Sequence, residues 1–273
     1  MNMNLRNKIK GAVYGFAIGD AMGATTEFMT DKQIKLFYGE VNEIVGGGWL
    51  ELQPGEVTDD TQMSICVMKA IMQKPEDVGH FKTICSDYFV DWLKTKPKDV
   101  GNQCLKSILL LMSGKDIPYN KDALGNGSLM RAMPLAILNL GFHNICQGTL
   151  THNNVTCSKF ITDYTRILQK YLYNNYNYKY SPIIKKPLEP TGYIENTFYN
   201  SLYWSNKDSF REAIIGAVNH GGDADTIAAI TGSLAGAKYG FDDIPKNWVN
   251  KINPEVKETL DSFISFAFDC LQV

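Results

Sequence analysis

Two short acidic segments place carboxylates and hydroxyls side by side, each directly before an apolar helical run. A single Thr or Asp is enough to cap the free N–H groups at a helix start, so capping accounts for only one residue of each segment. Adjacent carboxylates repel one another, and oxygen donors are the ligands that Mg²⁺ and Mn²⁺ prefer. Two matching segments therefore predict a dinuclear metal site with shared carboxylates. The candidate ligands are Thr58, Asp59, Asp60, Asp223, Asp225 and Thr226.

Two isolated polar residues are further candidates. Glu27 follows the predicted helix 5–23 at its C-terminal end, where the helix dipole disfavours an anion, so the position is compatible with a functional role. Taken alone, a solvated loop acid is the simpler interpretation. His152, in "LTHNNVT", lies near a predicted helix start and could support the site. For this histidine, a purely structural role is the simpler interpretation.

A glycine-rich segment offers backbone N–H groups to an anion. The stretch "GNGSLMRAMPLA" opens the predicted helix 128–140, and free N–H groups at the positive end of a helix suit a phosphate. Arg131 lies one turn into that helix and could pair with an acid of the metal site. Simple capping by a polar side chain is the alternative. The segment that would bind the anion consists of Gly125, Asn126, Gly127 and Ser128.

Helical periodicity dominates the elements that must position these residues. The one strand candidate, "EVNEIVGG" at 40–47, is weak, so the sequence predicts an all-α fold, with a single domain spanning 1–273. Loops are predicted at 45–57, 113–127 and 174–194, and the last is interpreted as a surface loop, with an interdomain linker as the alternative. The predicted helices span 5–23, 59–73, 80–94, 99–113, 128–140, 156–173, 208–219, 225–239 and 254–271.

Two rows of glycine indicate where the helices pack most closely. Gly11, Gly15, Gly19 and Gly23 are four residues apart and so line one ridge of the first helix. Gly232, Gly236 and Gly240 form a second row after the second acidic segment. Each glycine costs a helix about 1 kcal/mol relative to alanine, and close approach of two backbones is the simplest compensation. Both helices are therefore expected at the centre of an orthogonal bundle.

Composition excludes several classes of function. The chain of 273 residues has a formal net charge of −2, which gives no electrostatic attraction to nucleic acid. Its six cysteines form no CxxC pair, which favours free thiols in a reducing compartment. The N-terminus lacks a convincing signal peptide, and no apolar run reaches 18 residues. A cytoplasmic protein without a membrane partner is expected, and a monomer.

Five motifs in order carry a resemblance to a known family. They are "GAVYGFAIGDAMGATTEF", "EVTDDTQMS", "GNGSLMRAMPLA", "THNN" and "NHGGDADTIAAITGSLAGAKYG". In this order and combination they resemble the ADP-ribosylglycohydrolase family over roughly residues 8–240. Stretch 174–200 fits no pattern of that family.

The resemblance implies an all-α bundle around two divalent cations, Mg²⁺ or Mn²⁺. It implies that the two acidic segments are the two ligand groups, that Glu27 lies near the ribose, and that Gly125–Ser128 lies beside the phosphates of ADP-ribose. The implied reaction is hydrolysis of the bond between ADP-ribose and an N- or O-linked acceptor, on a protein or a small molecule. Glu27, Asp59 and Asp60 would move protons or stabilise an oxocarbenium-like ring.

Two alternatives remain open at the level of the sequence. A dinuclear metal phosphoesterase also requires oxygen ligands and would cleave a phosphate bond instead. A non-enzymatic module could keep the ADP-ribose pocket without turnover, because a fold does not guarantee an activity.

Overall fold

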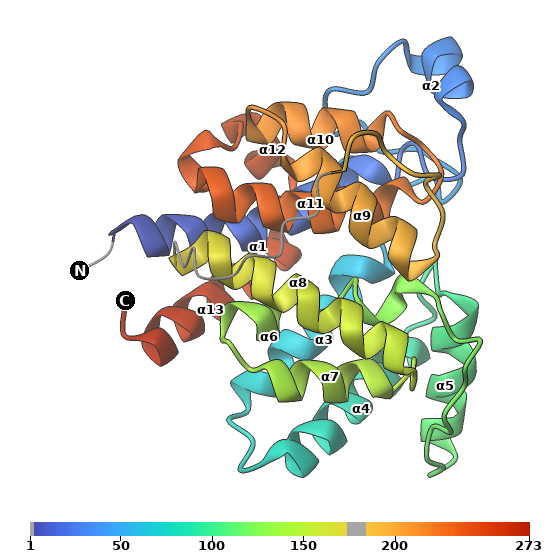
Figure 1. Ribbon diagram of the computed structural model, residues 1–273, viewed down its shortest axis with the longest axis vertical. Helices are drawn as coiled ribbons and strands as arrows, with labels where there is room; N and C mark the ends of the chain where they lie inside the picture. Colours follow the sequence, from blue (N-terminus) through green and yellow to red (C-terminus); the bar gives the residue numbers. More distant parts are fainter. Residues whose placement is uncertain (1–2, 174–183) are drawn as a thin grey trace.

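The computed structural model describes residues 3–173 and 184–273, and the regular secondary structure within both ranges is helical (Figure 1). No β-strand is present in these ranges, so the prediction of an all-α fold is confirmed. The helices are α1 (Met3–Gly23), α2 (Asp31–Tyr38), α3 (Asp59–Met72), α4 (Val78–Lys94), α5 (Asn102–Met112), η1 (Asn126–Ser128), α6 (Met133–Ile137), α7 (Gly141–Thr149), α8 (Val155–Tyr173), α9 (Ile194–Ser205), α10 (Phe210–Val218), α11 (Ala224–Tyr239), η2 (Phe241–Asp243), α12 (Lys246–Lys251) and α13 (Pro254–Leu271).

The central feature is an antiparallel pair formed by α1 and α11, which cross the middle of the molecule (Figure 1). A Cβ added to Gly15 would overlap the carbonyl oxygen of Gly232, and one added to Gly11 would overlap that of Gly236. Gly19 faces Ala228 in the same way. Each step of four residues along α1 is thus matched by four residues back along α11. The two backbones touch directly, as the glycine rows predicted.

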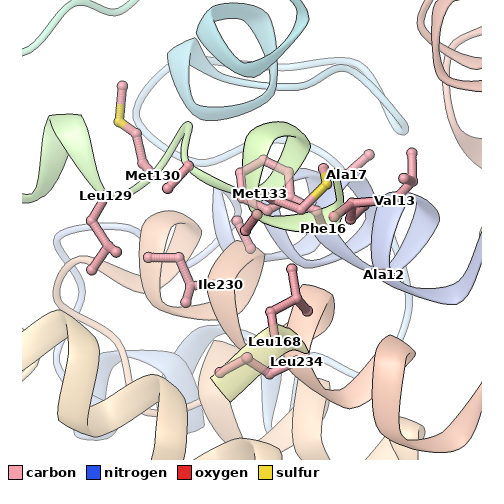
Figure 2. Packing of buried hydrophobic residues seen from close by; sticks show 14 of the residues in the cluster. Ala12, Val13, Phe16, Ala17, Leu129, Met130, Met133, Leu168, Ile230 and Leu234 are labelled. Carbon is pink, nitrogen blue, oxygen red and sulfur yellow. The ribbon is translucent and has the colours of Figure 1, made fainter. Parts of the chain in front are cut away.

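Apolar side chains from other helices close over this pair (Figure 2). Phe16 and Ala17 of α1 lie beside Met133 of α6, while Leu234 of α11 meets Leu168 of α8. All five are essentially removed from solvent. One continuous core cluster runs from residues of α1 to residues of α13, which fixes the helix ends that carry the acidic segments.

Two predicted elements are wrong. Residues 40–47 form no strand, because Gly46, Gly47 and Gly48 have φ values of 70°, 81° and 67°, a left-handed run that no strand accommodates. The predicted helix 128–140 is broken into η1 and α6. Pro134 lies at the start of α6, where its missing N–H is harmless, but it prevents a continuous helix from Ser128.

Four helices, α2, α7, α9 and α12, were not predicted. They are short, at 6 to 12 residues, and several carry polar or aromatic residues with indifferent helix propensity.

Part of the predicted loop 174–194 lies outside the described residues. Its described end covers the acidic segments, since the carbonyl of Pro190 accepts a hydrogen bond from Asp223 N at 2.9 Å. Among the described residues, no helix has the length and apolar character needed to cross a bilayer.

Candidate active site

The acidic segments meet in one cavity of about 610 Å³. The N-termini of α3 and α11 both point to the C-terminal end of α1, because the α1–α11 pair is antiparallel and α3 packs against both helices. Each segment stands at the first turn of its helix, so the fold brings them together across more than 160 residues of sequence. Predicted site residues that line the cavity are Glu27, Asp59, Asp60, Gly125, Asn126, Gly127, His152, Asp223, Asp225 and Thr226.

Hydrogen bonds show that capping is not the main role of the acids. Thr58 is the N-cap of α3, and its hydroxyl accepts the hydrogen bond of Asp60 N at 3.3 Å. Asp223 is the N-cap residue of α11 but makes no capping bond with its side chain. The Thr226 hydroxyl donates to Asp60 Oδ2 at 3.1 Å and so joins the two segments directly. The carboxylates therefore face one another rather than the helix N–H groups.

Asp20 is a buried acid of this cluster that the sequence analysis missed. It has no exposed surface and accepts hydrogen bonds from Thr58 N at 3.1 Å, the Thr58 hydroxyl at 2.8 Å and Thr61 N at 3.0 Å. It ties the start of α3 to α1. The sequence signal that could have identified Asp20 is a charged residue directly after Gly19, in an otherwise apolar part of the first helix. Asp99, half-buried beside Asp59 in the cavity wall, was also missed, and no pattern marked it.

Glu27 lies among the candidate metal ligands rather than apart from them. Its carboxyl and those of Asp223 and Asp225 each place an oxygen within 4.8 Å of the others. Trp49 Nε1 donates to Glu27 Oε2 at 2.5 Å. Burial raises the pKa of Glu27 to about 8, and the nearby Asp99 and Asp223 add to the shift, although the indole hydrogen bond opposes it.

The donor set fits a divalent cation. Asp60 Oδ1 and Asp225 Oδ1 are buried and have no hydrogen-bond partner among the described residues. Unpaired buried carboxylate oxygens are costly unless something positive satisfies them. Within ranges 3–173 and 184–273, no lysine or arginine lines this cavity. A hard cation would supply the missing charge to oxygen ligands of this kind.

Burial and crowding raise the pKa values of the acids of the site. Burial is the largest cause for each, and neighbouring carboxylates add to it at several. The pKa of Asp20 and that of Asp223 each rise to about 6. The pKa values of Asp59, Asp60 and Asp225 lie well above the ordinary range.

We expect the metal-free protein to lose stability as the pH rises from about 4 to about 8, because its folded state holds protons that the unfolded chain has released. The raised pKa values of Asp20, Asp223 and Glu27 define this window. Their stabilising contribution is complete below the unfolded pKa values and is lost above the folded ones. Added Mg²⁺ or Mn²⁺ should restore the stability at the upper end. Thermal unfolding across this range, with chelator and with metal, checks this; a flat curve in chelator would contradict it.

The glycine-rich segment differs from its prediction in three respects. Asn126–Ser128 forms a three-residue 3₁₀ helix with Gly125 as its N-cap residue, not the start of a long helix. The N–H of Asn126 is already bonded to Gly192 O at 3.0 Å, and its side-chain amide donates to Asp223 Oδ2 at 2.6 Å. Ser128 Oγ is buried without a hydrogen-bond partner among the described residues. Asn126 thus connects this segment to the acidic cluster.

Arg131 does not pair with an acid of the site, contrary to expectation. Its guanidinium is fully buried and donates to Gly127 O, to Gln147 and to the Thr151 hydroxyl, so it supports the glycine turn from beneath. His152 packs against the same turn, where a Cβ on Gly127 would meet its ring at 2.9 Å. Burial lowers the pKa of His152 to about 3, so this cavity-lining ring is neutral.

Known proteins similar to this chain carry related names. The family model described as ADP-ribosylglycohydrolase matches residues 1–159 and 161–271. The chain is 33% identical to the ADP-ribosyl-[dinitrogen reductase] glycohydrolase of Rhodospirillum rubrum over 97% of this chain and 98% of that protein. It is 29% identical to the ADP-ribosylarginine hydrolase Tri1 of Serratia proteamaculans, over 90% of this chain and 75% of that protein.

A solved structure gives the same result for the fold. The structure is described as an ADP-ribosylglycohydrolase-related protein complex, and it superposes with a TM-score of 0.79 at 24% identity, covering 97% of this chain and 98% of its own. The family model accounts for nearly every residue of the chain, and the similarity to the Rhodospirillum enzyme extends from end to end. The chain therefore belongs to the ADP-ribosylglycohydrolase family and is a hydrolase of glycosidic bonds to ADP-ribose.

Proposed function

We propose that this enzyme removes ADP-ribose from a modified arginine of a protein and releases ADP-ribose intact. The single observation that carries the proposal is the cavity in which Glu27 and the two acidic segments converge. Arginine is favoured as the acceptor because one relative over most of the chain is named an ADP-ribosylarginine hydrolase. An O-linked acceptor or an ADP-ribosyl small molecule would use the same site chemistry.

We assign two divalent cations, Mg²⁺ or Mn²⁺, to the six oxygen-bearing residues predicted from the sequence. The unpartnered oxygens of Asp60 and Asp225 support this assignment, and the position of Glu27 beside Asp223 makes it a seventh candidate. When bound, such cations lower the pKa of water and neutralise the crowded carboxylates. The predicted ligands are Thr58, Asp59, Asp60, Asp223, Asp225 and Thr226.

The remaining steps of the reaction are assigned to residues of the chain. Water adds to the anomeric carbon of the ribose, the bond from that carbon to the guanidine nitrogen breaks, and the departing nitrogen gains a proton. We assign the proton transfer to the Glu27 carboxyl, because it lines the cavity and lies beside Asp223 and Asp225. Asp59 and Asp60 would stabilise the positive charge that develops on the ring.

The phosphate end of the substrate would lie against Gly125, Asn126, Gly127 and Ser128, with His152 behind the turn. Gly125 and Gly127 let the neutral ring of His152 pack against the turn, because a Cβ at either position would meet that ring. A cytoplasmic location is part of the proposal, and the six cysteines, all free thiols in the structure, are consistent with a reducing compartment.

The acceptor is tested with matched peptides. We expect metal-loaded enzyme to release ADP-ribose from an ADP-ribosyl-arginine peptide and to leave an ADP-ribosyl-serine peptide largely intact. Chelator should stop the reaction, and added Mn²⁺ or Mg²⁺ should restore it. Equal or faster release from the serine peptide would overturn the choice of arginine.

The released product checks which bond breaks. Mass analysis should find ADP-ribose and the unmodified peptide, because the proposed substrate position places the ribose at the acids and the phosphates at the Gly125–Ser128 segment. AMP with a phosphoribosyl peptide would instead indicate cleavage of the pyrophosphate, the reaction of the phosphoesterase considered from the sequence. The same sample reports both outcomes.

A further inference from the structure

We propose that Trp49 is a positioning residue for the reaction, whose indole N–H holds the Glu27 carboxyl in the acidic cluster. This inference rests on the role proposed above for Glu27. The contact joins Trp49 Nε1 to Glu27 Oε2 at 2.5 Å, across 22 residues of sequence. Hydrogen bonds to a carboxylate are the stronger kind and fix its direction.

Packing does not account for the position of Trp49. Half of its surface is exposed, and Phe28, the residue that its ring meets, is 66% exposed. Their ring centroids lie 5.4 Å apart, and neither side chain belongs to the buried core. A large aromatic side chain left in solvent gains little from burial, so the polar end of the indole is what this placement uses.

The loop that carries Trp49 is fixed to the end of α1. The Thr25 hydroxyl donates to Gly46 O at 3.0 Å, and a Cβ on Gly48 would overlap the carbonyl oxygen of Ala24. Gly47 and Leu52 exchange backbone hydrogen bonds at 2.7 and 3.0 Å, which closes the loop around Trp49. Only glycine takes three successive left-handed positions at low cost, so the Gly46–Gly48 run serves to direct the following indole.

Glu27 is held from the other side by strained backbone. Phe28 has a φ of 61°, which is uncommon for an aromatic residue and costs roughly 1–3 kcal/mol. Two hydrogen bonds maintain it: Phe28 N donates to Gly222 O at 2.7 Å, and Gly222 N donates to Met29 O at 2.8 Å. These bonds fix the backbone of Glu27 next to Asp223, and the indole fixes the remaining freedom of its carboxyl.

A double-mutant cycle separates positioning from a merely structural role. The variants are Trp49→Phe, which keeps the ring and removes the N–H, Glu27→Gln, and both together. Trp204→Phe is the matched control, since the Trp204 Nε1 has no hydrogen-bond partner among the described residues. Each variant is measured for single-turnover release of ADP-ribose, for Mn²⁺ affinity by calorimetry and for thermal unfolding.

We expect Trp49→Phe to lower the rate about 10- to 100-fold and to weaken Mn²⁺ binding by a similar factor, as loss of a partner of a metal ligand does. In the Glu27→Gln background the same substitution should change both quantities less than about twofold, because the indole acts through that carboxyl. Melting temperatures should stay close to that of the unmodified protein, and Trp204→Phe should keep its rate.

Three results would overturn the inference. Equal effects of Trp49→Phe with and without the Glu27 carboxylate would show that the indole acts elsewhere. An unchanged rate in Trp49→Phe, with a large loss in Glu27→Gln, would remove Trp49 alone and leave the proposed function standing. Full activity in Glu27→Gln would instead remove the role of Glu27 from the proposed function, and the inference with it.

Discussion

Asp225→Asn is expected to lower turnover by on the order of 10³-fold or more while leaving the metal-free protein at least as stable as before. Asp225 Oδ1 has no hydrogen-bond partner among the described residues, so the amide replaces no existing bond. Burial and the adjacent Glu27 and Asp223 raise its pKa well above the ordinary range, which means that its charge destabilises the metal-free fold. The substitution removes that charge and a proposed metal ligand together.

Thermal unfolding and single-turnover assays on one preparation check both halves of this result. Added Mn²⁺ should raise the melting temperature of the unmodified protein more than that of Asp225→Asn. Asp163→Asn is the matched control, because Asp163 is a nearly buried carboxylate outside the cavity that pairs with Lys159 at 3.1 Å. The assignment of Asp225 as a ligand fails if Asp225→Asn keeps a rate near that of the unmodified enzyme.

Gly15→Ala is expected to lower the free energy of unfolding by about 3 kcal/mol, the upper end of the usual range for overpacking a rigid interior. The added Cβ would overlap the backbone carbonyl of Gly232, and a backbone cannot rotate away as a side chain can. In an ordinary helix the same change stabilises by about 0.5–1 kcal/mol. A destabilising effect of Gly15→Ala would therefore by itself indicate a close backbone contact. The loss is a large part of a typical net stability of about 5–15 kcal/mol.

Gly141→Ala provides the comparison for this substitution. Gly141 begins α7, and apart from its own helix and chain neighbours no atom of the described residues lies within 4 Å of the place where its Cβ would stand. We expect an unchanged or slightly raised melting temperature there, against a fall of roughly 6–12 °C for Gly15→Ala. Similar melting temperatures for the two variants would show that α1 and α11 are not in direct backbone contact.

Much of this fold was predictable because its strongest signals are local. Glycines repeated every four residues indicate a helix ridge that packs closely against a partner. Both α1 and α11 carry such a glycine row. Helices with weak local signals were missed. The sequence of α9, "IENTFYNSLYWS", has indifferent propensity, and burial of Phe198 and Leu202 supports it instead.

In the candidate site too, residues with a local sequence signal were predicted and residues without one were missed. Acids beside predicted helix starts were identified, and the structure brings Asp60 and Thr226 within hydrogen-bonding distance. Asp20 and Trp49 were not identified, because their roles depend on contacts that only the folded chain creates. The family and its hydrolase activity are confirmed, whereas the single-domain boundary, the individual site roles and the two cations stay predictions.

The pairing of α1 with α11 also determines when the protein can fold as it is made. Gly23 and Ala224 are separated by 200 residues, so the first helix leaves the ribosome long before its partner exists. At roughly 5–20 residues per second, this delay lasts about 10–40 seconds. During that time the glycine ridge has nothing to pack against, and Asp20 and Glu27 lack the acids of the second segment. The nascent chain therefore has no catalytic centre until synthesis has passed α11.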